Sequence, residues 1–126
     1  MMTKEAIANK YIDYLEKGDI KKLINLFNTK GIVDSPLYGI KKANKFYHEL
    51  NSDTINSELD LLGIFEENDS SNLALFFTYK WTLKNNEKVE FDVVDIIEFD
   101  AHNKILKLKI IYDTVIARKL VEQLEN

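Results

Sequence analysis

The chain has 126 residues, 45% of them hydrophobic and 30% charged, which suits one globular domain over residues 1–126. A net charge of −4 disfavours a general binder of phosphate backbones, because such proteins are normally basic. Cysteine is absent, which excludes disulfides, thiolate catalysis and cysteine-ligated metals. We therefore expect no nucleic-acid partner and no cofactor. The histidines, His48 and His102, are too far apart in the sequence to predict a metal site.

The N-terminal residues predict two short helices. Thr3 can cap the first, and Gly18 can end it, because one apolar stripe recurs between them at helical spacing: Ile7, Tyr11, Tyr14 and Leu15. Asp19 can cap a second helix that continues to Phe27, and Gly31 ends this pair. No signal peptide or membrane-spanning run is apparent, so a cytoplasmic location and no membrane partner are expected.

A short strand and a third helix follow. Ile32 and Val33 are typical of a strand, which Ser35 and Pro36 end. Gly39 precedes a helix whose apolar face comprises Ala43, Phe46, Tyr47 and Leu50.

The second half changes to the alternating pattern of β-strands. Four segments, 55–67, 73–83, 88–99 and 104–114, alternate apolar and polar residues and are joined by short polar turns, which indicates an antiparallel meander. In the first of them, Ile55, Leu59, Leu61 and Phe65 are expected to share one face. A closing helix is expected over 115–124. Three helices followed by four antiparallel strands predict an α+β fold.

Several short motifs in this order resemble a known family. Tyr11 to Phe27 match Y-x-x-x-L-x-x-G-D-x-x-x-L-x-x-L-F, and Val33-Asp34-Ser35-Pro36 follows them. Together with the motifs near the C-terminus, Ile97-Glu98-Phe99-Asp100 and Ile111-Tyr112-Asp113-Thr114, this order of motifs resembles the nuclear transport factor 2-like superfamily, in particular its SnoaL-like and ketosteroid-isomerase-like branch. The resemblance implies a cone: a curved antiparallel sheet wrapped around the N-terminal helices (a cystatin-like α+β barrel), with an apolar pocket inside.

Asp95 is the most informative single residue. It lies on the apolar side of its strand, between Val93 and Ile97, where burial should raise its pKa. A neutral carboxyl there could donate a hydrogen bond to a developing oxyanion. The alternative is a structural aspartate whose oxygens are satisfied by Tyr79, Trp81 or a backbone N–H.

The resemblance implies part of a catalytic site. Tyr11 and Asp95 match the two hydrogen-bond donors of a ketosteroid isomerase. The family's base is an aspartate immediately before the proline, where this chain has Ser35, and a serine hydroxyl is too weak a base. Asp34 lies one residue earlier and should face the other side of the strand. The cyclase branch has a catalytic aspartate where this chain has Ile110.

The expected pocket lining is apolar and suits a small apolar or aromatic molecule, although simple core packing is the alternative for most of it: Tyr47, Phe77, Tyr79, Trp81, Phe91, Val93, Leu108 and Tyr112. Three functions stay open. The chain is a small-molecule-binding domain without a complete catalytic set, an isomerase-like or cyclase-like enzyme using Tyr11 and Asp95, or a protein-interaction domain.

The outer face of the predicted sheet also carries apolar residues: Leu62, Ile64, Phe76, Val94, Ile96 and Ile111. Charged residues surround them: Lys80, Glu90, Lys107 and Lys109. An apolar patch with a charged rim usually marks an interface, so this face predicts a homodimer.

Overall fold

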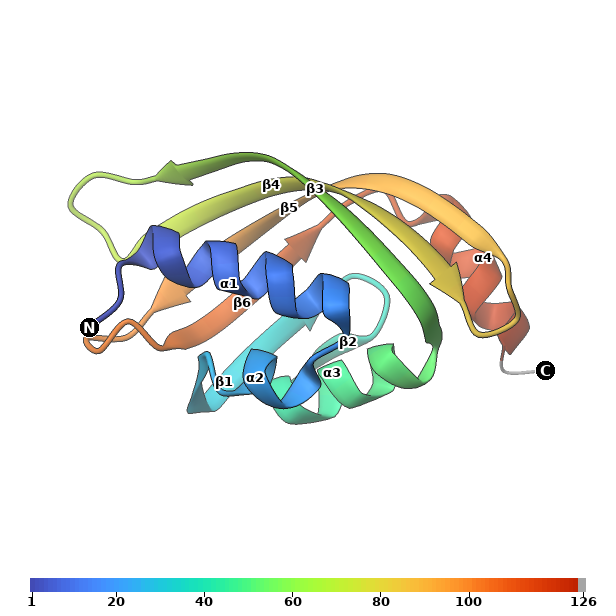
Figure 1. Cartoon of the computed structure of the whole chain (residues 1–126), viewed down its shortest axis with the longest axis horizontal. Coiled ribbons are helices and arrows are strands. Elements are labelled where there is room, and N and C mark those ends of the chain that lie inside the picture. The colour runs from blue at the N-terminus through green and yellow to red at the C-terminus, as the bar shows by residue number, and fades with distance from the viewer. Residues whose placement is uncertain (125–126) are drawn as a thin grey trace.

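A curved sheet arches over three helices, and a fourth helix lies at one end of it (Figure 1). The computed structural model describes residues 1–124. The elements in chain order are α1 (Lys4–Lys17), α2 (Ile20–Ile24), β1 (Phe27–Ser35), β2 (Gly39–Lys42), α3 (Ala43–Ser52), β3 (Thr54–Glu66), β4 (Asn72–Leu83), β5 (Lys88–Phe99), β6 (Ile105–Ile111) and α4 (Val115–Leu124).

The sheet has six strands in the order β2-β1-β6-β5-β4-β3. Every neighbouring pair is antiparallel except β1 and β6, which are parallel. The edge strands β2 and β3 do not pair with each other, so the sheet is curved but open. The predicted α+β class and the meander β3–β6 are confirmed.

The N-terminal helices form largely as the sequence predicts. The Thr3 hydroxyl accepts the Ala6 N–H at the start of α1, and Gly18 ends the helix in the left-handed conformation with φ 69°. Asp19 then caps α2 through the N–H of Lys22. The predicted extension of this helix to Phe27 is wrong, because the chain leaves the helix after Ile24 and Phe27 begins β1.

The strand expected at 32–33 is the middle of β1, and Gly31 lies inside it rather than ending a helix pair. A Cβ on Gly31 would lie 2.9 Å from the carbonyl oxygens of Asn28 and Ile105, so only glycine allows β1 to approach β6 this closely. The chain turns after Ser35, and Gly39, with φ 82°, starts β2. β2 was not predicted, so the sheet has six strands, one more than the short strand and the four-stranded meander that the sequence indicates.

A bulge in β3 reverses the predicted faces of its second half. Leu59 is buried as expected, but the pairing of β3 with β4 slips by one residue between Leu61 and Gly63. Ile64 therefore pairs with Leu75 and turns inward, whereas Phe65 is 60% exposed on the outer face. The predicted common face for Ile55, Leu59, Leu61 and Phe65 is wrong, because a one-residue slip exchanges the two faces of a strand.

The core lies between the concave face of the sheet and the helices, with α1 running across that face (Figure 1). The Glu16 carboxylate at the end of α1 accepts the N–H of Leu59 on the edge strand β3, at 2.8 Å. We call two parts of the concave face its aliphatic half and its aromatic half. The aliphatic half comprises Leu73, Leu75, Ile97, Ile105 and Leu108, and the aromatic half comprises Phe77, Tyr79, Trp81 and Phe91.

The C-terminal helix α4 confirms the closing helix expected over 115–124. The N–H of Val115 donates to the Asp113 carboxylate at the start of this helix. Ala117 and Val121 are buried, and Arg118 donates to the Pro36 carbonyl at 2.6 Å. Residues 1–124 contain no helix with the length and apolar character needed to cross a membrane.

Candidate functional site

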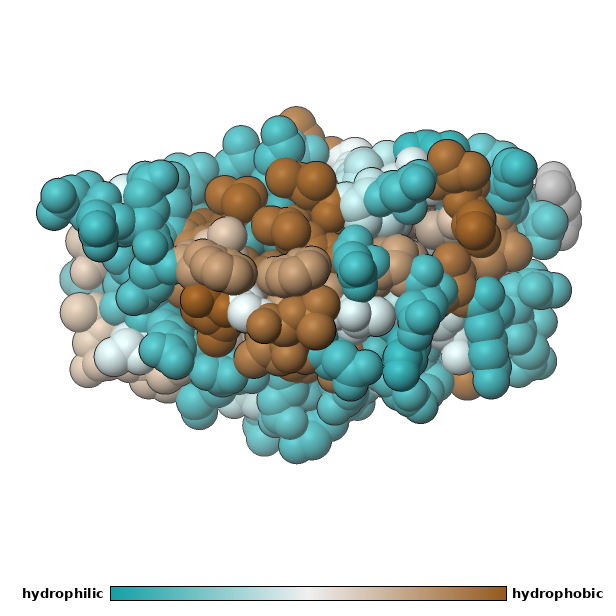
Figure 2. Space-filling view, turned by 90° about the horizontal axis from the view of Figure 1, so that it is seen from above, coloured by the Kyte–Doolittle hydropathy of each residue, from teal (hydrophilic) through white to brown (hydrophobic). Residues whose placement is uncertain are grey.

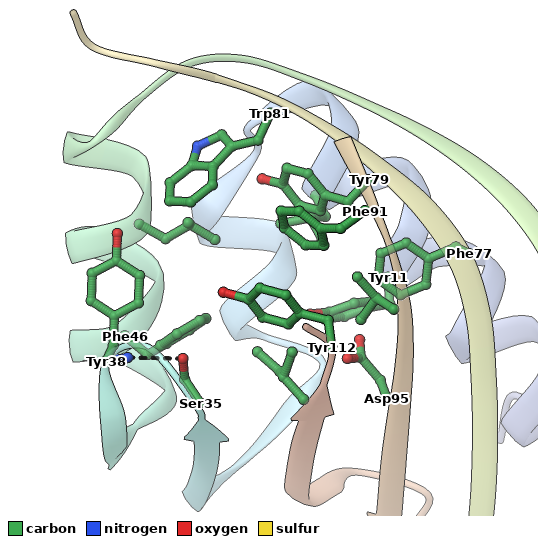
Figure 3. A pocket seen from close by; sticks show the side chains of 14 residues that line it. Tyr11, Ser35, Tyr38, Phe46, Phe77, Tyr79, Trp81, Phe91, Asp95 and Tyr112 are labelled. Carbon is green, nitrogen blue, oxygen red and sulfur yellow. Dashed lines mark hydrogen bonds between the residues drawn. The ribbon is translucent and has the colours of Figure 1, made fainter. Parts of the chain in front are cut away.

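A cavity of about 50 Å³ lies between the aromatic half of the sheet and the helices α1 and α3 (Figure 3). Its lining is almost entirely apolar, with a few hydroxyl and carboxyl groups. The lining residues are Tyr11, Leu15, Ser35, Tyr38, Phe46, Leu50, Phe77, Tyr79, Trp81, Phe91, Val93, Asp95, Ile110 and Tyr112.

Asp95 carries the carboxyl group of this cavity. Its side chain is 1% exposed, and it stands in register with Leu75 on β4 and Ile110 on β6. Among residues 1–124, neither carboxyl oxygen has a hydrogen-bond partner. Burial therefore raises the pKa of Asp95 well above its ordinary value. Burial thus favours the neutral form of the carboxyl, whose O–H is a hydrogen-bond donor.

Tyr11 and Tyr47 form a buried pair beside Asp95. Their hydroxyl oxygens are 2.7 Å apart, and both side chains are almost fully buried. Burial, with smaller contributions from Tyr47 and Asp95, raises the pKa of Tyr11, so its hydroxyl stays protonated. When the Tyr47 hydroxyl donates to the Tyr11 oxygen, the Tyr11 proton is free to point into the cavity. Tyr47 does not line the cavity itself but holds Tyr11 from behind.

Ser35 lies across the cavity, on the side of Tyr38 (Figure 3). Its hydroxyl oxygen accepts the backbone N–H of Leu37 at 3.1 Å and that of Tyr38 at 3.0 Å. Because these two bonds occupy its acceptor sites, Ser35 can donate a hydrogen bond but cannot accept a proton. Asp34, the other candidate base, pairs with Ile40 on β2 and does not line the cavity.

Three stacked aromatic rings form one wall. Tyr79 stacks on Phe91 with ring centroids 5.6 Å apart, and Phe91 stacks on Tyr112 at 4.2 Å. Burial raises the pKa of Tyr112 to about 12. The Tyr79 hydroxyl of this wall already has a partner, because it lies 2.7 Å from the hydroxyl of Ser57.

Trp81 likewise donates its indole N–H to the Thr54 hydroxyl, at 2.8 Å. The alternative in which Tyr79 or Trp81 satisfies Asp95 is therefore not the arrangement observed. Within residues 1–124 the Asp95 carboxyl thus remains buried without a hydrogen-bond partner.

The structure brings most of the sequence-predicted site residues together. Six of the eight predicted lining residues face the cavity: Phe77, Tyr79, Trp81, Phe91, Val93 and Tyr112. Tyr47 and Leu108 are instead fully buried in the core. Leu15, Tyr38 and Leu50 also line the cavity and were not predicted. Leu15 could have been found, because it lies four residues after Tyr11 on the same helical stripe.

The volume limits what can enter. An engineered cavity of about 150 Å³ holds one benzene molecule, whereas this one has about 50 Å³. A ring-sized ligand therefore enters only if side chains of the wall move. Phe91 and Tyr112 are both partly exposed, so they can move at lower cost than the buried residues around Asp95. Among residues 1–124, no cluster of three or more His, Asp or Glu side chains could hold a metal ion.

Comparisons with known proteins identify the fold. No family model and no curated protein matches the sequence. Many solved structures match the fold. An NTF2-like protein of unknown function from Burkholderia pseudomallei K96243 is 13% identical, with a TM-score of 0.82 over 96% of this chain and 98% of that one.

Two further similar structures have described partners or reactions. TerC, co-crystallised with polyporic acid, is 16% identical, with a TM-score of 0.79 over 94% of this chain and 98% of that one. The epoxide hydrolase/cyclase-like enzyme SalBIII, which acts in pyran ring formation in the polyether salinomycin, is 12% identical, with a TM-score of 0.76 over 87% and 90%. The chain thus has the NTF2-like, SnoaL-like fold that its motifs resemble.

Proposed function

We propose that this protein binds a small, largely apolar molecule through an oxygen atom that accepts hydrogen bonds, such as a carbonyl or a phenolate. The observation that carries this proposal is the buried Asp95 carboxyl, which has no hydrogen-bond partner in the part of the chain that the structure describes. An unsatisfied buried polar group costs about 1–3 kcal/mol, so a ligand oxygen that accepts from Asp95 recovers this energy on binding.

The polar groups around the cavity favour an acceptor. Asp95, Tyr11 and Ser35 each have a hydroxyl proton to donate, and the rest of the lining is mainly aromatic and aliphatic. A ligand oxygen fits these donors, whereas burial disfavours the ionised carboxylate that a cationic ligand would need. The similarity of the fold to TerC, which was co-crystallised with a small organic molecule, supports this class of ligand.

Binding of substituted phenols, followed by NMR titration or calorimetry, tests the proposal. Asp95→Asn keeps a donor at the site and should bind phenols nearly as well as the wild type. Asp95→Leu removes the donor and should weaken binding by about tenfold or more, since a hydrogen bond to a charged oxygen is worth about 1.5–3 kcal/mol. Asp92→Asn, on the opposite face of β5, is the matched control and should change nothing. Equal affinities in all four proteins would contradict the proposal.

A second candidate is an isomerase-like enzyme, and the neighbouring donors Tyr11 and Asp95 are the observation that favours it. Two donors near one oxygen would stabilise a dienolate. A base is missing, because Ser35 is held as a donor and Asp34 lies outside the cavity. Wild-type protein should therefore show negligible isomerisation of a β,γ-unsaturated ketone.

Ser35→Asp should supply the missing base. One carboxylate oxygen can accept the N–H groups of Leu37 and Tyr38 as the serine does, because aspartate favours such turns, and the other oxygen then faces the cavity. A positioned base contributes about 10²–10⁴-fold in rate, which a spectrophotometric assay resolves. Adding Tyr11→Phe should remove part of the gain. Turnover by the wild type would contradict this prediction and make Asp34 the first suspect as base.

The third candidate, a protein-interaction domain, is favoured by the small volume of the cavity. It becomes the better interpretation if none of the variants binds a phenol.

A further inference from the structure

The cavity meets the protein surface at the end of the sheet where β1 and β6 finish. These two strands are parallel, and their register places Ser35 beside Ile110, both of which line the cavity. Tyr38 and Tyr112 line it as well, and both are partly exposed. We call these two tyrosines the rim. The helix α4 lies at this same end of the sheet (Figure 1).

Arg118 reaches from α4 back to the rim. Its Nη2 group donates to the carbonyl oxygen of Pro36 at 2.6 Å, and Pro36 directly follows Ser35 in the turn that leads to Tyr38. On its other side, the positive charge of Arg118 acts on Tyr112: burial raises the pKa of Tyr112 to about 12, and Arg118 opposes this rise. The guanidinium therefore lies near both tyrosines of the rim.

The lysines around the cavity are directed elsewhere or already paired. Those of β4 and β6 point to the convex face of the sheet, whose middle is hydrophobic (Figure 2): Lys80, Lys107 and Lys109. Lys41 and Lys84 share a surface groove with Tyr38, but they form ion pairs with Glu49 and Asp53. These lysines therefore do not compensate a negative charge at the rim.

Arg118, by contrast, keeps most of its binding capacity. It is the one arginine of the sequence, and its guanidinium carries five N–H donors. The Pro36 carbonyl accepts from Arg118, and none of the ion pairs within residues 1–124 involves this side chain. The Asp113 carboxylate, beside Tyr112, is engaged at the start of α4, where it accepts the N–H of Val115 at 3.1 Å. The rim therefore has a positive charge that a neutral carbonyl does not balance.

We propose that the ligand carries a carboxylate at the end opposite its acceptor oxygen, and that Arg118 and the Tyr112 hydroxyl bind this carboxylate at the rim. The inference rests on the proposed function, which places the acceptor oxygen at Asp95. Asp95 stands in register with Ile110, and Tyr112 is two residues farther along, which is about 7 Å in a strand. This separation suits one aromatic ring with a short acidic side chain.

The alternative role for Arg118 is to attach α4 to the turn after Ser35. A single bond to a carbonyl needs only one donor, whereas a planar guanidinium can also hold a carboxylate by two parallel hydrogen bonds. The two roles predict different selectivities. Loss of an attachment weakens the binding of every ligand alike, whereas loss of a carboxylate contact weakens only the binding of acids.

The test compares para-hydroxyphenylpropionate with its primary amide, which has the same ring and phenol oxygen but no charge. Calorimetry at neutral pH measures both affinities. The wild type should bind the acid about tenfold more tightly, because charge-assisted hydrogen bonds are roughly twice as strong as neutral ones. Arg118→Gln should remove this preference by weakening the acid alone, and Arg118→Lys should keep part of it. Tyr112→Phe should reduce it by a smaller factor.

Lys119→Gln is the matched control, because it removes the same charge from the neighbouring, exposed position of α4. It should leave the preference for the acid unchanged. An equal loss in Lys119→Gln and Arg118→Gln would overturn the proposal, since net charge alone then accounts for the effect.

Asp95→Leu separates this inference from the proposed function. If the wild type binds acid and amide equally and Asp95→Leu weakens both, the carboxylate contact is overturned and the proposed function stands. If neither compound binds the wild type, both fail. A parallel loss of acid and amide binding in Arg118→Gln would assign Arg118 to the attachment of α4 and overturn the proposal. Circular dichroism of each variant shows whether it is folded.

Discussion

The aliphatic and aromatic halves of the concave face are made by the same strands but have different packing. Along β4, Leu73 and Leu75 are fully buried, and on β5 the adjacent Ile97 is equally inaccessible. Farther along the same strands, Tyr79 and Phe91 stack beside a cavity, and Phe91 is partly exposed. Asp95 stands at the boundary, in register with Leu75.

The difference teaches where this molecule is stable and where it can bind. The aliphatic side chains are almost completely removed from water, so the aliphatic half supplies much of the stability. Flat rings leave gaps that branched chains would fill, and they can be displaced at the partly exposed edge. The buried carboxyl of Asp95 lowers stability at this boundary, and such a cost is typical of a site kept for binding.

The largest effect should come from truncating one residue in each half. Ile97→Ala leaves a cavity in a closely packed region and should lower the free energy of unfolding by about 2–5 kcal/mol. Phe91→Ala removes a larger side chain but should cost less, because Phe91 is partly exposed and already borders empty space. Urea unfolding of both variants measures the two values. A greater loss for Phe91→Ala would show that the aromatic half is as tightly packed as the aliphatic one.

A smaller effect, dependent on pH, should come from Asp95. Its folded pKa is raised by burial, so at a pH above the ordinary value near 3.8 the unfolded chain releases this proton while the folded chain keeps it. Asp95 therefore destabilises the fold least below that pH, and above it the free energy of unfolding falls by up to about 1.4 kcal/mol per pH unit until the folded pKa is reached.

Asp95→Asn removes this ionisation. The difference in unfolding free energy between the wild type and Asp95→Asn should move in favour of the variant as the pH rises from 4, and urea titrations at several pH values measure it. Asp92→Asn, on the exposed face of the same strand, is the control and should not show this trend. A constant difference for Asp95→Asn would mean that Asp95 is ionised in the folded protein.

The sequence predicts a strand well where its apolar and polar residues alternate in only one way. Strict alternation in β4 and β5 correctly predicts that the Asp95 side chain lies on the buried face, because residues two apart in a strand point to the same side. The bulge in β3 could not be predicted in the same way. Apolar side chains occupy both alternations around Gly63, at Leu61, Leu62, Ile64 and Phe65, so the pattern does not determine which residue is skipped.

The site depends on distances that no local pattern contains. The presence of Tyr11 on the inner stripe of α1 is predictable from helical spacing. Its hydrogen bond to Tyr47 requires α1 and α3 to meet beneath the sheet, which is a property of tertiary packing. Likewise, the Ser35 hydroxyl can only donate because its oxygen accepts the N–H groups of Leu37 and Tyr38 in the following turn. The sequence does not predict the geometry of this turn.

The contact between Glu16 and Leu59 has a consequence for solubility. β3 is a long edge strand, and unpaired N–H groups along such an edge can recruit a strand from another molecule and begin a fibril. The Glu16 carboxylate occupies one of these N–H groups, and the bulge at 61–63 interrupts the regular row. Both features hinder continuous strand addition, so copies of this chain are directed away from open-ended aggregation through that edge.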